Sequence, residues 1–153
     1  MINYNKRQPE STRNKTRTLI VDGHPIIRQA LTRLVNQELN LGVCAETKNA
    51  NQALDAVKKQ QVDLAIVDIS LEGKSGTQLV EKIKLRYPNI SVLILKMHDE
   101  AFYVEDPLQV AEQEHIVNEQ ATEQIIKAVR YVQFLLRNQI FGFTVLVEAE
   151  GRE

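Results

Sequence analysis

The apolar run Leu64–Val67 ends on a carboxylate, Asp68, and shows no alternation of polar and apolar side chains. A strand of this kind is buried on both faces, which is typical of parallel sheets with helices on each side. A second apolar run, Thr18–Val21, ends on Asp22. Because ligands of open parallel sheets bind at the carboxyl ends of the strands, the two acids predict one functional site. The simpler alternative is that each acid ends a buried strand and faces water.

Apolar runs alternate with segments of helical period through most of the chain, and this is the pattern of βα repeats. After Val21, apolar residues recur at spacings of three and four, and Pro25 suits the first turn of the helix that they predict. An α/β fold with a parallel sheet is therefore expected. Its strands two to four are predicted at residues 43–47, 64–68 and 91–95.

The second half of the domain has weaker signals. Ile116 and Val117 predict a weak fifth strand, and the pair Asp106-Pro107 favours a short or kinked fourth helix that begins there. Residues 125–136 carry the apolar stripe of a long final helix. Five strand and helix pairs are the expected total.

The segment Phe141–Glu148 alternates with a period of two and predicts an additional, C-terminal strand. We therefore divide the chain into a basic N-terminal arm (1–16), a domain (17–138) and a strand-like tail (139–153). Bulky side chains on one face of the tail favour a homodimer through this strand or the final helix, because an exposed strand edge recruits partners. The alternative is that the tail packs against its own domain.

Charge is unevenly distributed along the chain. Residues 1–17 contain five basic residues and one acidic residue, which leaves 14 basic and 19 acidic residues in the remainder. Nucleic-acid contacts require clustered Lys and Arg, so direct DNA binding is not expected of the globular part. The arm is either a solvated tail or a contact for an anionic partner. A single cysteine, no signal-like start and no long apolar run predict a cytoplasmic protein without a membrane segment.

Three segments together resemble bacterial response-regulator receiver domains, most closely the NarL/LuxR branch: Leu19–Arg28 (LIVDGHPIIR), Val62–Ser70 (VDLAIVDIS) and Tyr87–Asp99 (YPNISVLILKMHD). The resemblance covers about residues 17–137. It implies a flavodoxin-like (CheY-like) (βα)5 doubly wound parallel sheet with strand order 2-1-3-4-5. It also implies a role in a two-component phosphorelay, in which a histidine kinase supplies the phosphoryl group and Asp68 accepts it.

The same resemblance implies a Mg²⁺ site formed by Asp22, Asp68 and the backbone carbonyl of Ser70. Four other positions that matter in the family carry different residues here. They are Gly23 for the second acid, Lys96 for the switch Ser or Thr, Asn118 for the lysine and His115 for the aromatic switch residue. We therefore expect Mg²⁺ to bind weakly at most and phosphorylation of Asp68 to be weak or lost.

Lys96 has two interpretations. Either its ammonium pairs with Asp68 and fills the space of the missing cation, or it extends into solvent. His115 is either a proton-sensitive element or a plain surface residue. His24 and His98 lie near strand ends without the spacing of a known metal motif, so no metal cluster is assigned to them.

The function expected from the sequence is a degenerate receiver module that acts by binding a histidine kinase or another signalling protein, and not an enzyme. A LuxR-type DNA-binding domain needs on the order of 60 further residues. One alternative is a conventional phosphorylated receiver, as a fragment of a longer transcriptional regulator. The other is a flavodoxin-like small-ligand binder or enzyme that uses the same crevice.

Overall fold

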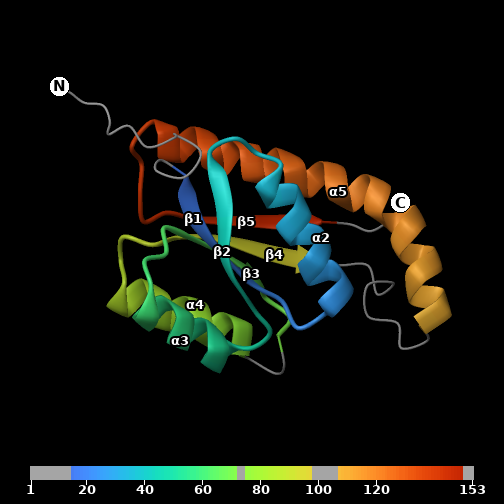
Figure 1. The fold of residues 1–153 in the computed structure, drawn as a ribbon, viewed down its shortest axis with the longest axis horizontal. Coiled ribbons are helices and arrows are strands. Elements are labelled where there is room, and N and C mark those ends of the chain that lie inside the picture. Colours follow the sequence, from blue (N-terminus) through green and yellow to red (C-terminus); the bar gives the residue numbers. More distant parts are fainter. Residues whose placement is uncertain (1–14, 72–74, 98–106, 150–153) are drawn as a thin grey trace.

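The computed structural model describes residues 15–71, 75–97 and 107–149 of the chain. They form a single sheet of five parallel strands in the order β2-β1-β3-β4-β5, with helices on both faces (Figure 1). The fold class and the strand order are those predicted. The strands are β1 (Thr16–Val21), β2 (Leu41–Thr47), β3 (Leu64–Asp68), β4 (Ser91–Met97) and β5 (Thr144–Ala149). The helices are α2 (Pro25–Asn36), α3 (Ala50–Lys59), α4 (Ser75–Arg86) and α5 (Pro107–Arg137).

Each face of the sheet has its own hydrophobic core. Alternate residues of β3 enter different cores: Leu64 and Ile66 pack with α2 and α5, whereas Ala65 and Val67 pack with α3 and α4. All five residues of β3 are buried, as the unbroken apolar run predicted. Every apolar side chain of the strand thus loses its water contact, and this burial is the main favourable contribution to folding.

The fifth strand is not where we expected it. Ile116 and Val117 lie within α5, a continuous helix of 31 residues, so the predicted fifth strand and the separate short helix before it are wrong. Residues 108–137 contain no Gly or Pro and are rich in Ala, Glu, Gln and Leu, which favour helix over strand. Two β-branched residues are too few to end such a helix.

The segment expected to be an additional strand is β5 itself. It pairs in parallel with β4, so the sheet continues past residue 138, where we expected the domain to end. The predicted alternation is present, because Phe143, Val145 and Val147 pack against the core while Leu146 is exposed.

A tight connection leads from α5 into β5. Gly142 has φ +72°, and a Cβ atom at this position would lie 2.5 Å from the carbonyl oxygen of Pro88. The N–H of Gly142 donates to Oγ of Ser91 at 3.0 Å. Nζ of Lys84 donates to the carbonyl oxygen of Gly142 at 3.2 Å. These contacts fix the start of β5 against β4 and α4.

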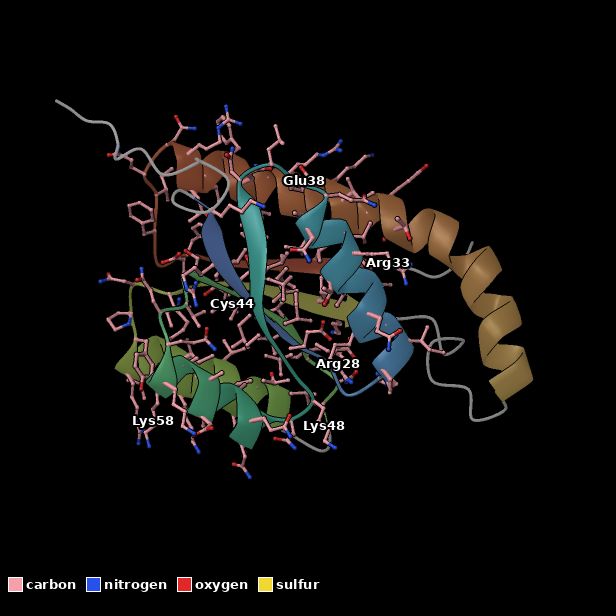
Figure 2. The ribbon with its side chains drawn as sticks, viewed as in Figure 1. Arg28, Arg33, Glu38, Cys44, Lys48 and Lys58 are labelled. Atoms are coloured by element: carbon pink, nitrogen blue, oxygen red, sulfur yellow. The ribbon has the colours of Figure 1, made fainter. Side chains whose placement is uncertain are left out.

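The C-terminal part of α5 is tied to the loop after α2 on the same face of the sheet. Glu38, just after α2, lies beside α5 (Figure 2), where its Oε2 is 3.4 Å from Nε of Arg130. No helix in the described part of the chain is long and apolar enough to cross a lipid bilayer.

Candidate acidic site at the carboxyl edge of the sheet

Two buried carboxylates meet where β1 and β3 end. Asp22 directly follows β1 and is 1% exposed, and Asp68 is the last residue of β3 and is 3% exposed. Since β1 and β3 are neighbours in the sheet, the structure brings both acids to one edge. The backbone N–H of Asp22 donates to the carbonyl oxygen of Thr47, which holds this end of β1 against β2. Burial of two acids this close together requires compensating positive charge or hydrogen bonds.

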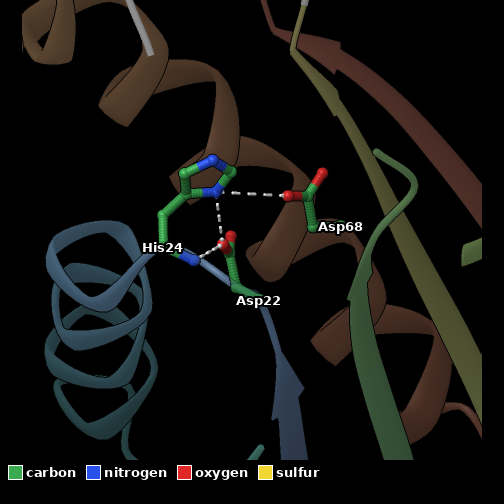
Figure 3. A group of neighbouring side chains, drawn as sticks. All are labelled: Asp22, His24 and Asp68. Atoms are coloured by element: carbon green, nitrogen blue, oxygen red, sulfur yellow. Dashed lines mark hydrogen bonds and ion pairs between the residues drawn. The ribbon is translucent and has the colours of Figure 1, made fainter. Parts of the chain in front are cut away.

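His24 supplies part of that compensation (Figure 3). Its Nδ1 lies 3.0 Å from Oδ1 of Asp22 and 3.7 Å from Oδ2 of Asp68, and its backbone N–H donates to the same Asp22 oxygen at 2.8 Å. The ligand atoms of these three residues all lie within 4.8 Å of one another. No role was predicted for His24 from the sequence, so its contact with both acids was missed. The available signal was its position two residues after Asp22, in the short loop before α2.

Asp68, the last residue of β3, is held by Ser70, which lies two residues further along the chain. Ser70 donates its backbone N–H at 3.0 Å and its hydroxyl at 2.8 Å, both to Oδ1 of Asp68. Burial raises the pKa of Asp68, and the charge of Asp22 raises it further, while the Ser70 hydrogen bonds and His24 act in the opposite direction. The site therefore disfavours two free carboxylate charges and favours a cation.

The electrostatics of His24 are complementary. Its hydrogen bond with Asp22 raises the pKa of the imidazole; burial lowers it, and the charges of Asp22 and Asp68 raise it. The imidazole thus gains stabilisation as a cation from both acids. The side chain is 35% exposed, so solvent screens part of this interaction.

The backbone around Asp22 is also braced from α2. Nη1 of Arg28 donates to the carbonyl oxygen of Asp22 at 2.8 Å, and its Nε lies 3.6 Å from Oε1 of Glu46. Arg28 lies at the carboxyl edge of the sheet, as does Lys48 (Figure 2). Arg28 thereby fixes the loop that carries His24.

An open pocket of about 450 Å³ adjoins the acids. Its lining comprises Gly23, His24, Lys48, Asn49, Ala50, Asp68, Ser70 and Leu71. A Cβ atom on Gly23 would lie 3.5 Å from the carbonyl oxygen of Lys48 and 4.0 Å from Cδ2 of Leu71, which are ordinary contacts. Gly23 therefore leaves space where the resembled family carries its second acid.

Lys96 does not reach the acids. Its Nζ lies 4.0 Å from Oε2 of Glu148 on β5, and both side chains are about half exposed. Among the described residues no ion pair joins Lys96 to Asp68, so of the two interpretations of Lys96 the pair with Asp68 is not found. The register explains this, since Asp68 is level with Leu95 while Lys96 is level with Glu148.

Two further predicted positions lie elsewhere. His115 and Asn118 fall within α5, and not at the end of a strand. His98 lies outside the described residues. The expected constellation is therefore reduced to Asp22, Asp68 and Ser70, with His24 added.

The donor set fits Mg²⁺ only in part. Mg²⁺ takes six oxygen ligands in octahedral geometry, usually one or two carboxylates with several waters. Here the second acid of the loop is replaced by Gly23, and an imidazole nitrogen faces the two remaining carboxylates. The residues present thus form a mixed nitrogen and oxygen donor set.

The sequence relates this chain to signalling proteins. Residues 18–130 match the response regulator receiver domain family. The transcriptional regulatory protein DegU of Brevibacillus brevis is 28% identical over 119 residues, which cover 78% of this chain and 50% of that protein. The oxygen regulatory protein NreC of Staphylococcus epidermidis is 30% identical over 115 residues, which cover 74% of this chain and 53% of that protein. The chain therefore spans about half the length of these relatives.

Solved structures agree with the fold. A structure of two RcsB dimers bound to two parallel DNAs matches with a TM-score of 0.61 at 22% identity, covering 86% of this chain and 64% of that chain. The non-phosphorylated receiver domain of the stress response regulator RcsB from Escherichia coli matches with a TM-score of 0.59 at 17% identity, covering 86% of this chain and 98% of that chain. At these identities the likeness establishes the fold alone. The family match, however, extends over well more than half of the residues, and so the chain belongs to the response regulator receiver domain family.

Proposed function

We propose that this receiver domain works by binding another protein and that phosphorylation of Asp68 is weak or lost. The observation that carries this proposal is the position of His24. Its imidazole lies against both buried carboxylates, while Gly23 provides no second acid for a metal ion. Attack of a carboxylate on a phosphoryl group requires cations that neutralise the crowded negative charge.

The residues that would stabilise a phosphoryl group on Asp68 are displaced or absent from the described site. Lys96 pairs with Glu148 on β5, and Asn118 is neutral and lies within α5. The described cationic side chains beside the pocket are those of His24 and Lys48, which come from the loops after β1 and β2. A phosphoryl group would therefore meet fewer of the charge-assisted hydrogen bonds that stabilise it.

The partner is expected to be a histidine kinase or another signalling protein in the cytoplasm. Exposed apolar side chains on α5, before β5 and on β5 support a protein contact; they are Tyr131, Phe134, Phe141 and Leu146. A second copy of the chain is one such partner. The acidic balance of the globular part argues against direct DNA contact by this domain.

The proposal is tested by incubation with a small-molecule phosphodonor and Mg²⁺, followed by intact mass spectrometry. Asp68→Asn is the matched control, because it keeps the shape of the side chain but cannot form the acyl phosphate. We expect little or no adduct on the wild-type chain under conditions that modify an unrelated conventional receiver fully. A stoichiometric adduct that Asp68→Asn abolishes would reject the proposal.

That outcome would support the second candidate, a conventional phosphorylated receiver. The specific observation in its favour is that Asp68 lines the open pocket and is oriented by two hydrogen bonds from Ser70. The nucleophile is thus accessible and fixed. What distinguishes the two candidates is whether the surrounding cations suffice for transfer.

A further inference from the structure

We propose that Asp22, His24 and Asp68 form a site for a borderline divalent transition metal of the Zn²⁺ class, in place of Mg²⁺. The site concerns the same pocket as the proposed function but does not depend on whether Asp68 is phosphorylated. Three kinds of observation support it: the spacing of the donor atoms, the state of the carboxylate oxygens and the chemistry of the donor set.

The donor atoms are gathered near the spacing of ligands that share one ion. Zn²⁺ binds imidazole nitrogen and carboxylate oxygen at about 2.1 Å, so two ligands of one tetrahedral or octahedral ion lie about 3.0–3.4 Å apart. Nδ1 of His24 is 3.0 Å from the Asp22 oxygen and 3.7 Å from the Asp68 oxygen (Figure 3). The ligand atoms of the three residues lie within 4.8 Å of one another, so the side chains must draw together for all three to reach one ion.

The carboxylates retain oxygens for a ligand. Within the described part of the chain, the hydrogen bonds that the two side-chain carboxylates accept from His24 and Ser70 end on Oδ1 of Asp22 and Oδ1 of Asp68. Within the described part of the chain, the nearest charged partner of Oδ2 of Asp68 is His24 at 3.7 Å, which is too long for a hydrogen bond. Asp68 lines the open pocket, so a cation that enters the pocket can reach its carboxylate.

The donor set selects among metals. Imidazole suits Zn²⁺, Cu²⁺, Ni²⁺ and Fe²⁺, whereas Mg²⁺ prefers oxygen ligands only. Replacement of the second acid by Gly23 removes an oxygen donor, and His24 adds a nitrogen donor. Both changes move the preference of the site in the same direction.

The surroundings meet two further needs of a metal site. Hydrogen bonds from Ser70 orient Asp68, and Arg28 braces the carbonyl group of Asp22, as outer partners do for metal ligands. His24 and Asp68 both line the open pocket of about 450 Å³. The pocket gives an ion a path to the ligands and room for the waters that complete its coordination.

The test is calorimetric titration of the full chain with ZnCl₂ and with MgCl₂, without phosphodonor. We expect one Zn²⁺ per chain, bound at least about ten-fold more tightly than Mg²⁺. His24→Gln should weaken Zn²⁺ binding by about ten-fold or more and leave Mg²⁺ binding unchanged. Equal Zn²⁺ affinity of the wild type and His24→Gln, or tighter binding of Mg²⁺ than of Zn²⁺, would overturn the proposal.

Control variants remove the cysteine and the other two histidines of the chain. Cys44→Ser, His98→Ala and His115→Ala should each retain the Zn²⁺ affinity of the wild type; loss of binding in any of them with retention in His24→Gln would place the metal elsewhere. Co²⁺ absorption gives a second readout, because a visible band that His24→Gln abolishes reports a nitrogen ligand directly. Circular dichroism checks that His24→Gln is folded, and His24→Asn replaces it if it is not. Since no phosphodonor is present, failure of this proposal is distinct from failure of the proposed function.

Discussion

Nδ1 of His24 lies 3.7 Å from Oδ2 of Asp68, although the two residues belong to different βα units. Their proximity depends on the parallel pairing of β1 with β3, which brings the loop after one strand over the end of the other. Asp22 interacts with both residues: it accepts a hydrogen bond from His24, and its negative charge repels that of Asp68. The ionisation of His24 therefore depends on both acids, and that of Asp68 depends on Asp22 and His24.

The free energy of unfolding should decrease as the pH rises from 6 to 8. His24 has a raised pKa in the folded state, so its contribution is complete below its ordinary value of about 6.5 and is lost as the pH rises through the raised pKa. The raised pKa of Asp68 has the same sign, because its ionisation opposes folding as the pH rises. We expect a smaller free energy of unfolding at pH 8 than at pH 6 in urea titrations.

The variant His24→Gln should lose most of this difference, since glutamine keeps a polar side chain but does not titrate. His115→Gln controls for the titration of another histidine. An identical difference in the wild type and in His24→Gln would show that the proton is bound elsewhere.

Gly23→Asp should restore an acid pair. The space for its Cβ is open, with its nearest neighbour at 3.5 Å, so the backbone need not move. A third carboxylate beside two buried ones should lower stability without metal at neutral pH and raise the affinity for Mg²⁺. Thermal unfolding with and without MgCl₂ measures both effects, and we expect a larger rise in the midpoint for Gly23→Asp than for the wild type.

Gly23→Asn is the matched control, because it has the same size and no charge. If both variants respond to Mg²⁺ alike, the missing acid is not what weakens the site.

Much of the fold was predictable because its signals are local. The unbroken run of β3 and the spacing of apolar residues in α2 depend only on neighbours in the chain, and both are confirmed. Placement of the fifth strand depends on competition between distant segments. The C-terminal segment that follows Gly142 supplies an alternating strand that pairs with β4, and nothing near Ile116 indicates that this edge is already filled.

In the candidate site, too, some features follow from local sequence and others depend on distant segments. Asp22 and Asp68 were found because each ends an apolar run. The contact of His24 with Asp68 requires the pairing of β1 with β3, and the separation of Lys96 from Asp68 requires the register of β3, β4 and β5. A one-residue difference in register reverses the face of a strand side chain, so this part was beyond sequence patterns.

Gly142→Ala should destabilise the domain. A methyl group would lie 2.5 Å from the carbonyl oxygen of Pro88, and φ of +72° is unfavourable for any residue with a Cβ. We expect a loss of roughly 1–3 kcal/mol in the free energy of unfolding, measured by urea titration. Gly42→Ala is the control, since its nearest neighbour is the flexible side chain of Lys15 at 3.2 Å. An equal cost for both substitutions would contradict the role given to the turn before β5.

Association through the outer side of β5 is tested without removing the strand. Deletion of the tail would uncover β4, whereas Leu146→Lys keeps β5 in the sheet and places a charge on an exposed apolar position. A dimer formed through this side should dissociate, because an unpaired charge buried in an interface costs more than the apolar contact that it replaces. Light scattering should report the mass of a monomer for Leu146→Lys. Leu39→Lys changes a more exposed leucine between α2 and β2, and it should keep the mass of the wild type. A dimeric mass for both variants would show that Leu146 on β5 is not in the interface, because a lysine there would disrupt a packed contact.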